Sequence, residues 1–140
     1  MTLTAVPVQA SSILDKVTSE ETTDDHAEDT SYSLLKGNNL NYGNVKVQRI
    51  SSNEIGIHGL TQCHHACDTV YLSLYLERKV NGSYGTYKYW EFTADNVTSL
   101  SKELVVIVPS GTYYRVRGYH AAKDGSKEST STLTSGIMIK

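Results

Sequence analysis

The sequence predicts an all-β fold, namely a seven-stranded antiparallel sandwich, with a small β-barrel as the alternative. From about residue 40 onward, apolar and polar residues alternate with the period of a half-buried strand. Turn sequences such as Asn81-Gly82 and Pro109-Ser110-Gly111 separate the alternating stretches at near-regular intervals. No stretch of this region has a helical pattern, and no connection has room for the crossover helix that parallel strands need. The strands are therefore expected to pair in antiparallel fashion.

The clearest strand is 69–78, in which an aliphatic residue occupies every second position from Val70 to Leu76. The stretch 100–108 is strongly β-branched, which also favours a strand. A chain of 140 residues allows one ordinary domain, assigned here to 40–140. The expected strands are 44–50, 54–60, 69–78, 86–93, 100–108, 112–121 and 130–139.

The first ten residues are expected to be the remnant of a secretory signal peptide. They are small and apolar, and they end in Val8-Gln9-Ala10, which has the small-x-small form of a signal-peptidase site. We expect that the complete precursor begins upstream of Met1 and that cleavage leaves Ser11 as the mature N-terminus. The predicted location is therefore secreted, or extracellular. No apolar stretch approaches the ~18 residues of a transmembrane helix, so no membrane span is expected.

Residues 11–39 are expected to form an acidic, flexible lead-in. Between Ser11 and Ser31 there are seven acidic residues against Lys16 alone, a charge of −6, so the remainder must carry +4 to give the net −2. A net charge of −2 argues against nucleic acid or a membrane surface as a general partner. The asymmetry suggests that the acidic arm, or the arm of a second chain, folds onto a basic face of the domain.

The stretch Cys63-His64-His65-Ala66-Cys67 contains four potential metal ligands, and two interpretations compete. In an exported protein, Cys63 and Cys67 are expected to form a small disulfide. The alternative is a zinc or copper site made by Cys63, His64, His65 and Cys67, although a standard zinc module has a second pair of ligands. The disulfide is favoured, so no cofactor is expected.

A Tyr/Arg face is predicted on the outside of the sheet. If the aliphatic residues of 69–78 face the core, Tyr71 and Tyr75 lie outside. The same alternation places four residues of 112–121 outside, and the sandwich makes the two strands neighbours. Tyr and Arg are enriched at binding hot spots, and tyrosine rings also stack on sugars, although cross-strand packing is an equally good explanation. The predicted surface consists of Tyr71, Tyr75, Tyr113, Arg115, Arg117 and Tyr119.

Residues 111–119, Gly-Thr-Tyr-Tyr-Arg-Val-Arg-Gly-Tyr, resemble the sixth strand of fibronectin type III and immunoglobulin-like sandwiches. This resemblance implies that Tyr114 is a buried corner tyrosine and that Val116 and Gly118 face inward. Other segments resemble a family of small, uncharacterised secreted proteins of Gram-positive bacteria, which implies export and an all-β fold but no activity. Those segments are 40–45, 67–72, 96–100, 114–120 and 128–130, together with Trp90.

No catalytic motif is present: the sequence has no Gly-x-Ser-x-Gly elbow, no His-Glu-x-x-His, no P-loop and no dinucleotide fingerprint. The protein is therefore not expected to be an enzyme. The favoured function is a secreted binding domain that recognises an extracellular glycan, cell-wall polymer or protein through the Tyr/Arg face. The alternatives are a metal-binding or redox protein that uses Cys63–Cys67, and a small secreted effector or bacteriocin-like protein.

Overall fold

The computed structural model describes residues 20–33 and 37–140, and these residues form a seven-stranded antiparallel sheet. The predicted all-β class, the number of strands and their antiparallel pairing are confirmed. Within the described ranges, no helix is long and apolar enough to cross a membrane. The strands are β1 (His26–Tyr32), β2 (Leu40–Ser51), β3 (Glu54–Val80), β4 (Ser83–Ile107), β5 (Thr112–Asp124), β6 (Ser126–Leu133) and β7 (Ile137–Ile139).

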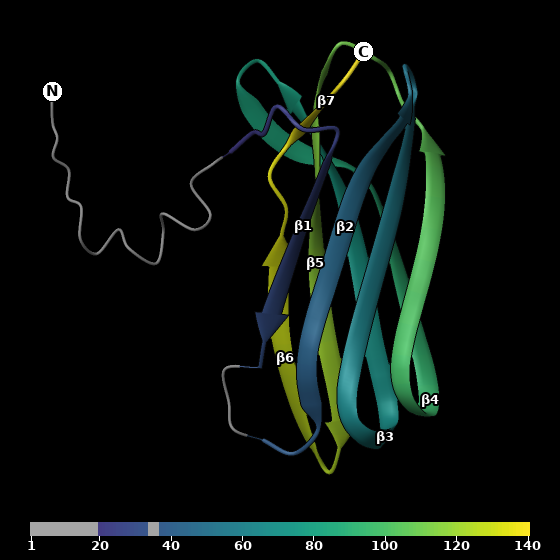
Figure 1. The fold of residues 1–140 in the computed structure, drawn as a ribbon. Coiled ribbons are helices and arrows are strands. Elements are labelled where there is room, and N and C mark those ends of the chain that lie inside the picture. The colour runs from purple at the N-terminus through teal and green to yellow at the C-terminus, as the bar shows by residue number, and fades with distance from the viewer. Residues whose placement is uncertain (1–19, 34–36) are drawn as a thin grey trace, which may run out of the picture.

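The sheet is built around a long hairpin, β3–β4, that doubles back on itself, as Figure 1 shows. Residues 54–62 of β3 lie between β2 and residues 99–107 of β4. Residues 67–80 lie between β5 and residues 83–97 of β4. The hairpin therefore contributes strands to two layers, one that contains β2 and one that contains β5. The two layers belong to one hydrogen-bonded sheet.

The doubled-back sheet is nearly closed, because β1 lies against β6 through side chains. The Asp29 carboxylate accepts a hydrogen bond from the backbone N–H of Leu133 at 2.9 Å. The hydroxyl groups of Ser31 and Thr130 are 2.7 Å apart. This nearly barrel-shaped sheet fits the small β-barrel that was the stated alternative.

The core lies between the two layers. Tyr114 is fully buried there, and its hydroxyl donates to the carbonyl of Pro109 at 2.5 Å. Val116 and Gly118 are buried with it, as predicted for inward-facing positions. The aliphatic side chains from Val70 to Leu76 face the same core and are wholly inaccessible to solvent.

Several predicted boundaries are wrong. The ranges 54–60 and 69–78 belong to one strand, β3. The range 86–93 and all but the last residue of 100–108 belong to one strand, β4. Between Gln62 and Cys67 the register shifts because β3 has three more residues than β4, and Asn96 of β4 adopts a left-handed φ of 56° nearby. These irregularities interrupt the alternation, which is why the sequence suggested a loop. The range 130–139 is divided between β6 and β7.

The expected flexible lead-in, 11–39, also needs correction where it is described. It contains β1, which pairs along its whole length with β2. The less exposed side of β1 carries Ala27, Asp29 and Ser31, and two of these three side chains are polar. The predicted signal remnant, 1–10, and residues 11–19 lie outside the described residues.

Candidate functional site

The predicted Tyr/Arg residues share the outer face of the layer formed by β3 and β5. Strand pairing places Tyr75 directly opposite Arg117, and Ser73 opposite Tyr119. Because directly paired residues project to the same side of a sheet, these side chains lie next to one another. The two strands are neighbours, as the sequence predicted.

Part of this face is hollowed into an open groove of about 450 Å³, which we call the tyrosine groove. Three tyrosines of the predicted set line it, and short Ser73 separates them. The charged ends of Glu91 and Lys127 contribute opposite charges to the lining. The complete lining is Tyr71, Ser73, Tyr75, Glu91, Phe92, Thr93, Tyr119 and Lys127.

Lys127 holds the rings at one side of the groove. Its ammonium lies 4.4 Å from the centroid of the Tyr71 ring and 5.9 Å from that of Tyr119. Sequence reasoning missed Lys127, Glu91 and Thr93, since they come from β6 and β4, and only the cross-strand register brings them to the groove. The one available signal was the alternation of β6, on which Lys127 is exposed.

The two arginines of the predicted set are engaged with the protein itself. The Nε atoms of Arg115 and Arg117 donate to the two carboxylate oxygens of Glu77, at 2.7 Å and 3.0 Å. Their guanidinium groups also cover rings: Arg117 lies 4.1 Å from the Tyr75 centroid and Arg115 lies 4.0 Å from that of Tyr84. Arg115, Arg117 and Tyr113 do not line the groove, and the first two serve the cross-strand packing that was weighed as the alternative.

The acidic lead-in docks at the end of this face, as the charge asymmetry suggested. Lys79 forms ion pairs with Glu20 at 3.3 Å and Glu21 at 3.0 Å. The Tyr84 hydroxyl donates to Glu21 at 2.7 Å, and this hydrogen bond is the main cause of the lowered pKa of the Glu21 carboxyl. Burial and the same carboxylate raise the pKa of Tyr84 well above its usual value. The contact is an anchor for the lead-in rather than a ligand site.

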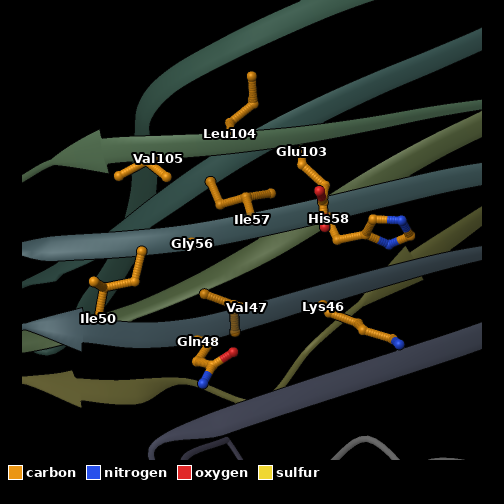
Figure 2. A pocket seen from close by; sticks show the side chains of 10 residues that line it. All are labelled: Lys46, Val47, Gln48, Ile50, Gly56, Ile57, His58, Glu103, Leu104 and Val105. Carbon is orange, nitrogen blue, oxygen red and sulfur yellow. The ribbon is translucent and has the colours of Figure 1, made fainter.

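A second hollow, of about 420 Å³, lies on the outer side of the other layer (Figure 2). Gly56 leaves its floor open, with Ile50 and Val105 at one end and His58 and Glu103 at the other. The Nδ1 atom of His58 is buried and has no hydrogen-bond partner among the described residues. Ile50 leans over Gly56, so that its Cδ1 would lie 3.2 Å from a Cβ at that position. Half of its lining residues are aliphatic, and no tyrosine, tryptophan or phenylalanine lines it, unlike the tyrosine groove.

The predicted Cys63–Cys67 disulfide is wrong, because both cysteines are free thiols. They lie at the two ends of the β3 bulge, where the hairpin doubles back, and both are buried. Burial raises the pKa of the Cys63 thiol to about 12, and the neighbouring Cys67 adds to the effect. Burial also raises the pKa of Cys67.

The metal ligands predicted as the alternative are only partly brought together. Of the described residues, the compact group of donors consists of His65, Cys67 and Asp124. Asp124 ends β5, and sequence reasoning missed it because 57 positions separate it from Cys67. His64 is exposed and lies outside this group, as does Cys63.

Comparison with known proteins bears on the family of the chain. No curated protein matches it in sequence. A similar solved structure is the sporulation control protein Spo0M from Bacillus subtilis, with 11% sequence identity and a TM-score of 0.37. The match covers 84% of this chain and 51% of that one, so the chain spans about half the length of this structural relative. The sequence pattern of one family covers residues 14–137, most of the chain, and the protein therefore belongs to that family of unknown function, DUF6147.

Proposed function

We propose that this protein is a secreted, non-catalytic binding domain that takes an extracellular glycan in the tyrosine groove. The single observation that supports this proposal most is the grouping of Tyr71 and Tyr119 around the short side chain of Ser73. Tyr75 completes the lining, and its own ring lies beneath Arg117 and stacks on Tyr89. Flat aromatic rings with polar rims stack on the apolar faces of sugar rings. Ser73, Thr93 and Glu91 offer hydrogen-bonding groups beside the rings.

The open shape of the groove favours a chain over a small, enclosed ligand. It follows the outer surface of a sheet and includes residues of β3, β4, β5 and β6. A cell-wall polymer or another extended glycan is therefore the ligand class that we infer. The small-x-small ending of residues 1–10, which predicts export, is the support for an extracellular ligand.

The test is a binding assay with purified cell-wall polysaccharide and a panel of neutral oligosaccharides. We expect the wild-type protein to bind at least one of them, and Tyr119→Ala to weaken that binding by about tenfold or more, since stacking on one ring contributes roughly 1–3 kcal/mol. The control is Tyr32→Ala, which removes an exposed tyrosine of β1 that is outside the groove. Equal binding by Tyr119→Ala and wild type would contradict the proposal, as would no binding to any probe.

Export has its own test, in which the protein is expressed from its own gene in a Gram-positive host. We expect the protein to accumulate in the medium with Ser11 as its first residue, as N-terminal sequencing would show. If the protein stays in the cells with an uncleaved N-terminus, the proposed secretion is wrong. The proposed glycan binding is tested separately and would not be affected.

A further inference from the structure

We propose that Cys67, His65 and Asp124 form a zinc site where β3 doubles back. The donor atoms of these three residues all lie within 4.8 Å of one another. They come from two elements, because His65 and Cys67 belong to the β3 bulge and Asp124 ends β5. This inference does not depend on the tyrosine groove.

One pair of the donors, His65 and Asp124, already has nearly the spacing of two ligands on one metal ion, whereas the whole group extends to 4.8 Å and would have to contract around an ion. The His65 Nδ1 and Asp124 Oδ2 atoms are 3.7 Å apart. Two ligands bound about 2.1 Å from a tetrahedral zinc ion lie roughly 3.4 Å from each other. A contraction of a few tenths of an ångström therefore suffices for this pair, and the exposed side chain of His65 can supply it.

Two oxygen atoms lie beside the Nδ1 atom of the His65 ring. The carbonyl oxygen of Ala66 lies 2.9 Å from Nδ1, on which the Asp124 carboxylate also converges. Two oxygen acceptors beside one nitrogen repel its lone pair unless a proton or a metal ion lies there. A zinc ion at Nδ1 would replace the hydrogen bond to the Ala66 carbonyl, whose oxygen lies where the ion would sit, so binding requires the ring to turn toward Asp124.

Asn39 orients the same ring from the other side. Its side-chain Nδ2 donates to the carbonyls of Asp124 and Ser126, at 3.2 Å and 3.0 Å, which fixes the direction of the amide. Its Oδ1 then faces the Nε2 atom of His65 at 3.3 Å and accepts the proton that Nε2 carries. A ligating histidine typically donates its second ring N–H to such an oxygen, which fixes the tautomer that binds metal through the other nitrogen.

The chemistry of the donors selects zinc. Thiolate, imidazole and carboxylate together are the ligands of zinc, whereas calcium and magnesium take oxygen ligands and copper(I) prefers sulfur. In the metal-free protein, burial keeps both thiols protonated. Zinc binding must therefore release the Cys67 proton to solvent.

The site would fasten the bulge of β3 to the β5–β6 turn. Zinc that binds the folded chain but not the unfolded chain stabilises the fold. The melting temperature is therefore expected to rise with zinc concentration. The experiment uses the full chain, kept reduced with a phosphine, freed of metal and titrated with zinc chloride in two buffers of different ionisation enthalpy. We expect one zinc per chain, released protons and a higher melting temperature.

Matched variants identify the ligands. Asp124→Asn keeps the shape of a partly exposed side chain, so its fold is preserved, and we expect zinc binding to weaken about tenfold or more. Cys67→Ala is expected to abolish binding and, with cobalt as the probe, the sulfur-to-metal charge-transfer band. His64→Ala removes an exposed neighbour outside the group and is expected to bind as wild type does. Absence of zinc binding, selective binding of copper(I), or unchanged affinity in Asp124→Asn would each overturn the proposal.

Discussion

A single buried histidine, His120, makes the stability of the protein depend on pH. Its side chain is inaccessible to solvent, and its Nδ1 and Nε2 atoms lie 3.2 Å and 2.8 Å from the hydroxyls of Thr61 and Thr132. The Thr61 hydroxyl donates to the carbonyl of Tyr71, so it accepts from Nδ1–H, and Nε2 accepts from Thr132. Both nitrogens are therefore satisfied by the neutral ring.

Burial lowers the pKa of His120 to about 4, against an ordinary value of 6.5. The unfolded chain thus takes up a proton between pH 6.5 and 4 that the folded chain refuses, and the stability from this residue is complete above pH 6.5 and falls as the pH is lowered. The loss is expected to be about 3 kcal/mol by pH 4.

Urea unfolding at pH 7, 5.5 and 4, together with an NMR titration of the histidines, measures this effect. The His120 ring signals should stay those of the neutral form down to about pH 4. The control is His64→Ala, which should keep the same pH dependence because His64 is exposed. Titration of His120 near 6.5 in the folded protein would contradict the prediction.

At the scale of the elements, the seam between β1 and β6 depends on side chains instead of a backbone ladder. Asp29→Ala removes the acceptor of the Leu133 N–H, a charge-assisted hydrogen bond. We expect this variant to lose about 1–3 kcal/mol of unfolding free energy, measured by urea denaturation at pH 7. Asp24→Ala, an exposed residue before β1, is the matched control and should change stability by less than about 0.5 kcal/mol. Equal unfolding free energies for the two variants would show that the contact between β1 and β6 contributes little to the stability of the sheet.

The same seam shows which strands sequence patterns can and cannot predict. The aliphatic residues from Val70 to Leu76 alternate with residues of the outer face, and that alternation correctly predicted the centre of β3. β1 was missed because Asp29 and Ser31, on its less exposed side, are polar residues that gain partners only from distant β6. The length of β3 was missed because the bulge after Gln62 breaks the period of two without ending the strand.

The residues of the candidate sites also differ in whether the sequence could predict them. Tyr71, Tyr75 and Tyr119 were predicted on one face from alternation and from the expected neighbouring of their two strands, and the pairing of β3 with β5 places them there. Lys127 and Asp124 were not predicted, because their positions depend on which residue of one strand lies opposite which residue of another. Register is set by the turns and the bulge of the whole sheet, so the local sequence around either residue does not contain it.

At the scale of the whole molecule, the doubled-back hairpin predicts that the two layers unfold together. β3 is the central strand of both layers: Ile57 packs in one and Leu74 in the other, and both belong to one continuous buried cluster. Separating the layers would therefore expose the core on both sides of the bulge, with no strand boundary at which one layer could open alone. A single cooperative transition is the expected result.

The measurement compares a probe of each layer in the same urea titration. Trp90 fluorescence reports on the half of β4 that pairs with residues 67–80 of β3, and amide exchange at Val47 reports on the other layer. Both are expected to give the same unfolding free energy within about 1 kcal/mol. A much lower value for Val47 would mean that the layer containing β1 and β2 opens first. The bulge between Cys63 and Cys67 would then be a hinge rather than a rigid bend, and zinc bound there should restore the common transition by fastening the hinge to Asp124.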